Sequence, residues 1–345
     1  MIEAQKKTVL IIGGGAVGAI AALNLEVGGL AEVTLVLRSN YDAVNTHGFD
    51  IKSCDHGQVQ GWKASRVRNT IPNLTTESLP PYGYILLCTK NIPDIPPTPA
   101  SLVAPALPPS NTHTVLILLQ NGLHIHKPFL ASHPTTPVLS GISMIGSEET
   151  APGKIIQDDP DRLLIGAFPN PNLGEDAGSA AAQDFARRYS AGGKTSCRVS
   201  GDVLHDRWRK LVYNAVLNPV CAILGLDTGR LRLAGGGEVV EGVVRPAMRE
   251  VVRAAGACGV QLEEGVVEEM VEAEPVESYL SPSMLADVRK GNFIEYENLL
   301  GEPLREGKEK GVEMPTIEML YYMAKAVQWR TAERKGLVEI PAKKV

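Results

Sequence analysis

The stretch Gly13-Gly14-Gly15-Ala16-Val17-Gly18 decides the fold predicted for this chain, because it directly follows the apolar run at residues 8–12. It fits the pattern G-x-G-x-x-G between a strand and a helix, in which the first glycine allows a tight turn and the second lets the backbone approach a pyrophosphate. The third lets the helix pack closely on the strand, and the helix N-terminus offers free N–H groups to phosphates. The stretch therefore predicts a dinucleotide-binding site at residues 13–18.

The next predicted strand, residues 32–37, follows a glycine pair at 28–29 that ends the first helix, and Arg38-Ser39 comes directly after it. Chains that bind NAD usually carry Asp or Glu at this point, to hydrogen-bond the ribose 2′-hydroxyl. A carboxylate would repel a 2′-phosphate, whereas a guanidinium can bind one with two hydrogen bonds. Arg38 therefore favours NADP(H), and the alternative is a solvated arginine that merely follows a strand.

Length and composition bound the class of protein. The 345 residues are long for one domain and sufficient for two, and 44% of them are apolar. Lysine and arginine (34) are outnumbered by aspartate and glutamate (39), which argues against a nucleic-acid partner. No apolar run approaches the ~20 residues of a membrane span, so no membrane partner is expected. The polar start of the chain, residues 1–7, predicts no signal peptide.

Cysteine usage favours a reducing compartment. The chain has five cysteines, widely spaced and without a C-x-x-C pair. This pattern is typical of free thiols in a cytoplasmic protein and predicts neither disulfides nor a metal site.

The pattern of apolar residues divides the chain in two. Continuous apolar runs, as in strands buried on both faces of a parallel sheet, occur at 84–88, 114–119, 138–143 and 162–166. Residues 92–109 hold too many prolines for a long helix, and 169–179 read as a polar loop. Helical periodicity takes over later, at 205–217, 239–257, 265–273, 283–290, 295–307 and 315–335. We expect an α/β domain with a doubly wound parallel sheet at 1–200, an all-helical domain at 201–345, and a cleft between them.

Two polar residues follow predicted strands of the sheet. Lys90 ends the run Cys88-Thr89-Lys90, and Asn121 lies in Gln120-Asn121-Gly122. Ligands of open α/β sheets bind outside the carboxyl ends of the strands, so both side chains are candidates for a ligand site. The alternatives are a solvated lysine and an ordinary Asn-Gly turn.

A third cluster lies in the segment Trp208 to Pro219. Lys210, Asn214 and Asn218 are spaced i, i+4 and i+8, which predicts that they share one face of a helix whose other residues are mostly apolar. Such a polar stripe is costly to bury without a purpose. Alternatively, it is the solvated face of the helix, with Asn218-Pro219 as a helix stop.

The fourth cluster has a structural interpretation that its spacing favours. Ser281-Pro282 is typical of a helix N-cap followed by a first-turn proline, and Asn292-x-x-Glu295 is typical of a capping box. Between them lies Ser283-Met284-Leu285-Ala286-Asp287.

These clusters, in this order behind the glycine turn, resemble the ketopantoate reductase (2-dehydropantoate 2-reductase) family over roughly residues 8–330. The most specific parts are Trp208-Arg-Lys-Leu with Asn214 and Asn218-Pro219, and Ser283-Met-Leu-x-Asp287 followed by Glu295. The resemblance implies an N-terminal Rossmann-type domain and a C-terminal helical domain, with NADPH and a small 2-oxo acid in the cleft. It implies reduction to a 2-hydroxy acid, with 2-dehydropantoate, an intermediate of pantothenate biosynthesis, as the first candidate.

The resemblance also implies roles for individual residues. The cofactor residues would be Gly13, Gly15, Ala16, Val17 and Gly18 at the pyrophosphate, Arg38 at the 2′-phosphate, and Lys90 and Asn121 towards the nicotinamide. Lys210 would be the catalytic acid, with Glu295 near both it and the cofactor. Asn214, Asn218 and Ser283 would bind the substrate.

The chain departs from the family pattern around the expected substrate. Thr228-Gly229 stands where the family usually has Asn-Gly, and residues 142–146 and 276–280 also differ. These departures leave open another branched 2-oxo acid as substrate, or a regulator that binds NADPH without catalysis. The sequence leaves the oligomeric state open as well, with a homodimer as one expectation.

Overall fold

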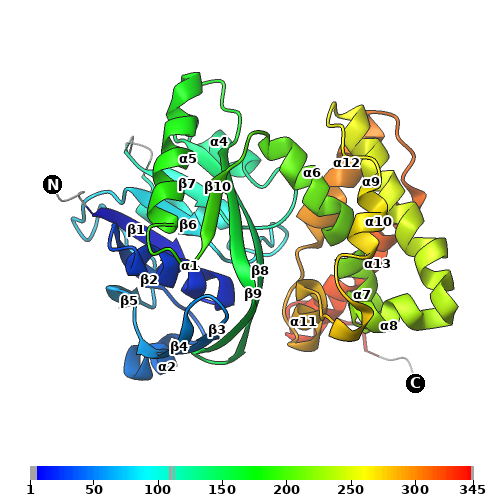
Figure 1. The fold of residues 1–345 in the computed structure, drawn as a ribbon, viewed down its shortest axis with the longest axis horizontal. Helices are drawn as coiled ribbons and strands as arrows, with labels where there is room; N and C mark the ends of the chain where they lie inside the picture. Colours follow the sequence, from blue (N-terminus) through cyan, green and yellow to red (C-terminus); the bar gives the residue numbers. More distant parts are fainter. Residues whose placement is uncertain (1–5, 109–110, 112, 343–345) are drawn as a thin grey trace. The chain divides into compact units, whose positions relative to one another are not determined.

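The computed structural model describes residues 6–108, 111 and 113–342. They form two compact units (Figure 1). The described residues of the first lie within 6–89, 97–120 and 125–203, and those of the second within 90–96, 121–124 and 204–342. The predicted division after residue 200 is thus three residues early. It also assigns Lys90–Pro96 and Asn121–His124 to the first domain, whereas these loops cluster with the helical unit, to which Asn91 and Leu123 are hydrogen-bonded.

The first unit is built on a ten-stranded sheet in the order β4-β3-β9-β8-β7-β6-β1-β2-β5, with β10 beside β9. The strands are β1 (Lys7–Ile12), β2 (Ala31–Val36), β3 (Phe49–Ser53), β4 (Gly57–Trp62), β5 (Arg66–Arg68), β6 (Tyr84–Leu87), β7 (Val115–Leu118), β8 (Val138–Ala151), β9 (Lys154–Ala167) and β10 (Ser196–Val199). Neighbours from β5 to β8 are all parallel, which confirms the predicted parallel sheet.

The remaining part of the sheet differs from the prediction. β8 and β9 form a long antiparallel hairpin, and β3 pairs antiparallel with β4. The predicted strands at 138–143 and 162–166 cover only the buried ends of this hairpin. Beyond them the residues become polar and partly exposed, so the continuous apolar signal stops while the antiparallel pairing continues.

Alternate residues of the central strands point into two separate cores. Val9 and Ile11 lie in the core that includes residues of α1 (Ala16–Val27) and α5 (Glu175–Tyr189). Leu10 and Ile12 lie in the other, with residues of α3 (Pro99–Val103) and α4 (Lys127–Ser132). Helices on both faces explain why these strands read as continuous apolar runs. The predicted loop at 169–179 is wrong in its second half, where α5 begins.

The proline-rich stretch at 92–109 contains only short helical turns in its described part, α3 and η1 (Ala104–Ala106), as predicted. Its residue 109 lies outside the described residues. The short helix α2 (Tyr41–His47) follows β2.

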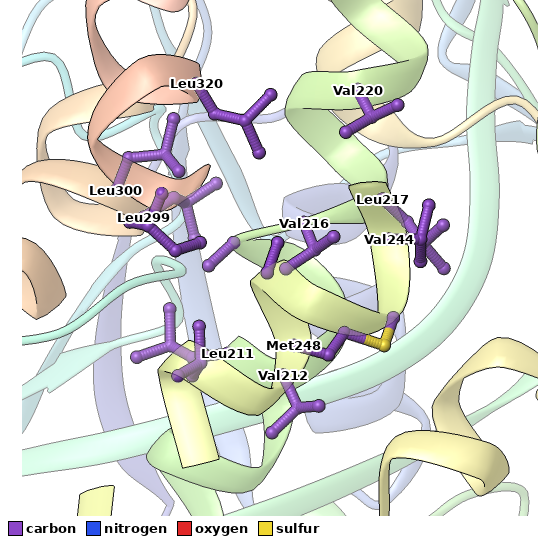
Figure 2. Close-up of a cluster of buried hydrophobic side chains, with 14 of the residues drawn as sticks. Leu211, Val212, Val216, Leu217, Val220, Val244, Met248, Leu299, Leu300 and Leu320 are labelled. Carbon is purple, nitrogen blue, oxygen red and sulfur yellow. The ribbon is translucent and has the colours of Figure 1, made fainter. Parts of the chain in front are cut away.

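The secondary-structure elements of the second unit are all helices in the part of the chain that the structure describes. Its elements are α6 (Val203–Asn214), α7 (Leu217–Leu224), α8 (Thr228–Leu233), η2 (Ala234–Gly237), η3 (Val240–Val244), α9 (Arg245–Ala257), α10 (Val266–Val271), η4 (Val276–Ser278), α11 (Ser283–Arg289), η5 (Glu297–Gly301), α12 (Glu302–Glu309) and α13 (Pro315–Arg334). Figure 2 shows part of its core, where Leu211 and Val212 of α6 and Leu217 of α7 lie among residues such as Met248 and Leu300. Helices occur at all six predicted positions, but the first, predicted at 205–217, ends at Asn214.

One expectation for this unit is wrong. Lys210, Asn214 and Asn218 do not follow one continuous helix, because α6 ends at Asn214 and α7 begins at Leu217. Val216 between them has a non-helical backbone, with φ −120° and ψ −64°. Pro219 explains the break, since it has no N–H for the carbonyl of residue 215 and its ring would clash with that carbonyl.

No single helix in the described part of the chain is long and apolar enough to cross a bilayer, and residues 203–224 and 228–237 reach that length and composition only as a pair bent by 88°.

Candidate active site

The glycine turn of the first unit has the geometry that a dinucleotide requires. Gly13 has a φ of +103°, and a Cβ on Gly18 would lie 1.9 Å from the Gly13 carbonyl oxygen, so both positions demand glycine. A Cβ on Gly15 would meet nothing within 4 Å, which leaves open space at the N-terminus of α1. That terminus has no side-chain cap and no acidic residue in its first turn. Its N–H groups therefore fit a pyrophosphate.

A buried side chain supports this turn. Asn40, 5% exposed, donates hydrogen bonds to the carbonyl oxygen of Gly14 at 2.8 Å and to Glu149 Oε1 at 2.7 Å. The turn is thus tied to the β8–β9 hairpin and is preformed, which reduces the ordering that a ligand must impose.

Arg38 lies at the carboxyl end of β2, where the sequence predicts it. Leu37 is buried, and its N–H donates to the carbonyl oxygen of Arg68 at the end of the neighbouring strand β5. Arg38 and Ser39 are exposed. The segment 36–40 carries no carboxylate, so nothing within it opposes an anion beside Arg38.

The second unit holds a partly buried lysine. Lys210 of α6 donates a hydrogen bond of 3.0 Å from Nζ to Asn121 Oδ1. Burial and the nearby cation of Arg207 lower the pKa of Lys210 to about 8, and the carboxylate of Glu295 opposes them. An amine with such a pKa is mostly protonated at neutral pH and yet exchanges its proton readily, as acid–base catalysis requires.

The loop that carries Asn121 is fastened to the helical unit. The N–H of Leu123 donates to the carbonyl oxygen of Asn298 at 2.9 Å, and Asn298 Nδ2 donates back to the Leu123 carbonyl at 2.8 Å. Gly122 has a φ of +101°, and a Cβ there would lie 2.6 Å from the Asn298 Cβ. Asn298 belongs to η5, a single π-helical segment, and such segments are frequent at functional sites.

Lys90 forms a second charged group with two carboxylates. Its Nζ lies 2.8 Å from Asp287 Oδ2 and 3.5 Å from Glu295 Oε2. Burial opposes its charge, but Glu295 and Asp287 outweigh burial and raise the pKa of Lys90. Lys90 therefore stays cationic across the neutral range. Its side chain remains 40% exposed, whereas that of Glu295 is 5% exposed.

Glu295 is not part of a capping box, so that expectation is wrong. Its Oε1 accepts a 2.8 Å hydrogen bond from the N–H of Asn91, and the following helix begins only after Glu295. The backbone of the loop after β6 thus satisfies this carboxylate. The predicted N-cap at Ser281 is also wrong, because Pro282 occupies the cap position of α11 and Ser281 Oγ accepts from Arg289.

The three predicted substrate residues are polar groups with unused hydrogen-bonding capacity. Asn214 and Asn218 are 9% and 3% exposed, and within the described residues no protein group hydrogen-bonds either side-chain amide. Ser283 is exposed at the first position of α11. Buried amides without protein partners are costly and fit a bound polar ligand.

Thr228 is a departure from the family pattern, and its polar groups are already occupied. It is 2% exposed, and its N–H and Oγ1 both donate to the Leu280 carbonyl oxygen, at 2.9 and 3.3 Å. Residues 276–280 are thereby fastened to the start of α8.

Lys90, Asn121, Lys210 and Glu295, which are far apart in sequence, lie together in the second unit, while the glycine turn and Arg38 belong to the first. Sequence reasoning missed the contributions of Arg207, Asp287 and Asn298. Asp287 was visible as part of the motif beginning at Ser283, and Arg207 lies three residues before Lys210. No sequence signal marked Asn298.

Comparison with known proteins agrees with these motifs. The family model "Ketopantoate reductase PanE/ApbA" matches residues 9–170, and "Ketopantoate reductase PanE/ApbA C terminal" matches residues 202–328. An uncharacterized protein of Saccharomyces cerevisiae is 37% identical over 353 residues, covering 97% of this chain and 97% of the relative.

Two solved structures share the fold. The crystal structure of 2-dehydropantoate 2-reductase from Methylococcus capsulatus has 29% identity and a TM-score of 0.76, and the match covers 94% of this chain and 98% of that one. A ternary structure of D-mandelate dehydrogenase with NADH and anilino(oxo)acetate has 20% identity and a TM-score of 0.72, covering 94% and 99%. The chain belongs to the ketopantoate reductase family of NADP-dependent oxidoreductases.

Proposed function

We propose that this protein reduces a 2-oxo acid to the corresponding 2-hydroxy acid with NADPH, with 2-dehydropantoate as the first candidate substrate. The observation that carries the proposal is the partly buried Lys210, whose Nζ donates a 3.0 Å hydrogen bond to Asn121 and whose pKa is lowered to about 8. A lysine with a purely structural role would not need an environment that lowers its pKa towards neutrality.

In this proposal, bound NADPH supplies the hydride. As negative charge develops on the oxygen of the substrate carbonyl, the positive charge of the Lys210 ammonium stabilises it. The ammonium then donates a proton to that oxygen. Asn121 accepts one Lys210 N–H and so fixes the direction of the remaining donors. After turnover the amine regains a proton from solvent.

The substrate would be held by groups that the protein leaves available. Asn214 and Asn218 offer amide donors and acceptors, and Ser283 offers a hydroxyl at the start of α11. These three would bind the carboxylate and the polar groups of the 2-oxo acid. Their support is the burial of the two amides without protein partners, described above.

Two sets of residues are candidates for binding the cofactor. Gly13, Gly15 and Gly18, with Ala16 and Val17, fit the pyrophosphate, and Arg38 fits the 2′-phosphate. Towards the nicotinamide, Asn121 and Lys90 are the candidates, with Glu295 fixing Lys90. Arg38 is the reason to favour NADPH over NADH.

A second candidate substrate is another 2-oxo acid. Thr228 stands where the family usually has asparagine, and both its backbone N–H and its hydroxyl donate hydrogen bonds to the Leu280 carbonyl oxygen. Thr228 therefore has fewer hydrogen-bonding groups available for a substrate than an asparagine side chain would have. With 2-dehydropantoate as substrate, the reaction would belong to pantothenate biosynthesis. We also propose that the protein is cytoplasmic and forms a homodimer. All five cysteines are free, which fits a reducing compartment.

The test is NADPH oxidation by the purified protein against a panel of 2-oxo acids, followed by absorbance. The panel contains 2-dehydropantoate, branched 2-oxo acids without a hydroxyl, and phenylglyoxylate. Highest kcat/KM for 2-dehydropantoate supports the first candidate, and highest kcat/KM for another member supports the second. Tight NADPH binding without reduction of any member would contradict an enzymatic role and indicate a regulator.

A further inference from the structure

Helix α6 carries three basic residues near its centre, and they have different environments. Arg209 is partly exposed and pairs with Glu269 at 2.5 Å and Glu263 at 3.5 Å. Arg207, by contrast, is 4% exposed. Because residues three apart share a helix face, Arg207 lies one turn before Lys210 and beside it.

Arg207 is bonded to the loop that contacts Lys210. Its Nη1 donates to the carbonyl oxygen of Gly122 at 2.7 Å, and the preceding residue, Asn121, accepts the hydrogen bond of Lys210 at 3.0 Å. Two successive residues of the loop are thus held by two side chains on one helical turn. A change at Arg207 would move the acceptor of Lys210 and not the lysine's own backbone.

The charge of Arg207 acts on the same lysine. The Gly122 carbonyl oxygen that Arg207 donates to is neutral and leaves the guanidinium charge in place. Burial lowers the pKa of Arg207 to about 9, so the side chain is cationic at neutral pH. The charges that shift the pKa of Lys210 are Arg207 on its own helix, which lowers it, and Glu295 on the segment before η5, which raises it, while the loop contributes the neutral amide of Asn121. Lys90 pairs with Glu295, and Asp287 pairs with Lys90, so these two groups influence Lys210 indirectly.

We infer that Arg207 is a positioning residue for the proposed reduction: it holds the Asn121–Gly122 loop against α6 and, as a cation at neutral pH, makes the Lys210 ammonium a better proton donor. The inference rests on the proposed role of Lys210. It assigns the tuning of the lysine to a neighbour on the same helix, with Glu295 as the opposing charge.

Three variants separate the two effects. Arg207→Lys keeps a cation and a donor, Arg207→Gln keeps a donor to Gly122 without the charge, and Arg207→Met keeps neither. Arg209→Gln is the matched control. It removes the same charge two residues further along α6, where Arg209 forms an ion pair with Glu269 at the surface.

The primary readout uses no substrate. The rate at which acetic anhydride acetylates Lys210 is measured against pH by peptide mass spectrometry, which gives the apparent pKa of the amine. We expect it to rise by about one pH unit in Arg207→Gln and Arg207→Met, so that labelling at pH 7 falls about tenfold. Wild type, Arg207→Lys and Arg209→Gln should coincide. The alkaline limb of kcat should shift with the labelling curve, and Arg207→Met should lose more kcat than Arg207→Gln.

An unchanged labelling curve in Arg207→Gln would overturn the electrostatic role. If that variant fails to fold, Arg207→Lys still decides the matter, because a full-unit shift despite the retained cation contradicts it. Equal kcat in Arg207→Gln and Arg207→Met would overturn the role of the loop contact. Shifted labelling in a protein that reduces no 2-oxo acid would sink the proposed function alone, whereas normal turnover with unshifted labelling would sink this inference alone.

Discussion

Lys210 donates a 3.0 Å hydrogen bond to Asn121, a residue 89 positions earlier in the chain. One residue comes from a helix and the other from a loop that lies, in sequence, among the strands of the first unit. The contact joins the group proposed to move a proton with the group that orients it. It also explains why this loop belongs to the helical unit.

Replacement of Lys210 by alanine tests the proton donor. Loss of a general acid typically lowers the rate by about 10²–10⁴. We expect such a fall in kcat for Lys210→Ala, with the Kd for NADPH nearly unchanged. Lys308→Ala is the control, because Lys308 is exposed and pairs with Glu318 at the surface. A Lys210→Ala enzyme with near-normal kcat would refute the mechanism.

The pH dependence of reduction follows from the protonated form of Lys210. Its pKa is lowered to about 8, so the acid form is present below that pH and is lost as the pH rises through it. We expect kcat/KM for reduction to be level near pH 6–7 and to fall about tenfold per pH unit well above 8. A profile that rises through this range would show that a base, and not an acid, limits the reaction.

Glu295→Gln should shift the alkaline fall of kcat/KM in the opposite direction to Arg207→Gln. The carboxylate of Glu295 raises the pKa of Lys210, so its neutralisation lowers that pKa and brings the fall in kcat/KM to lower pH. The Gln side chain can still accept from the N–H of Asn91. Glu297→Gln is the comparison, since Glu297 pairs with Arg305 and Tyr321 instead. A shift to higher pH would contradict the assigned sign.

Arg38→Asp should reverse the preference between cofactors. Loss of a charged hydrogen-bonding pair costs roughly 1.5–3 kcal/mol, so NADPH should bind about 10- to 100-fold more weakly while NADH binding holds or improves. Isothermal titration of both cofactors gives the ratio. Arg162→Asp, on an exposed position of β9, should change neither. A wild-type preference for NADH would mean that Arg38 does not bind a 2′-phosphate.

The glycine turn allows binding and stability to be separated. A Cβ at Gly18 would press on the Gly13 carbonyl oxygen, so Gly18→Ala should destabilise the fold by about 1–3 kcal/mol in urea unfolding. Gly15→Val places its side chain in open space, so the unfolding midpoint should hold. NADPH affinity should nevertheless fall about tenfold or more, because the side chain occupies the place of a phosphate that accepts backbone N–H bonds. Intact binding in Gly15→Val would remove the pyrophosphate from this turn.

Local signals were reliable where one local cause decides the structure. The glycine turn, the central strands and the helices after residue 200 were predicted because the spacing of apolar residues reflects which face is buried. The outer part of the β8–β9 hairpin was missed because its polar, alternating residues resemble loop sequence. The prediction that Lys210 and Asn218 lie on one continuous helix was wrong, because Pro219 breaks the helix and the spacing of apolar residues does not indicate that break.

The sequence by itself determined the parallel sheet, the glycine turn, the arginine after β2 and the family. These follow from backbone conformation and burial within short segments. Only the tertiary structure decided that Lys90 pairs with Asp287 and Glu295, that Asn121 receives Lys210, and that Arg207 and Glu295 act on it with opposite charge. The physical reason is that electrostatic interactions depend on distance and burial in space, and residues separated by up to 205 positions meet only after the loops have packed onto the helices.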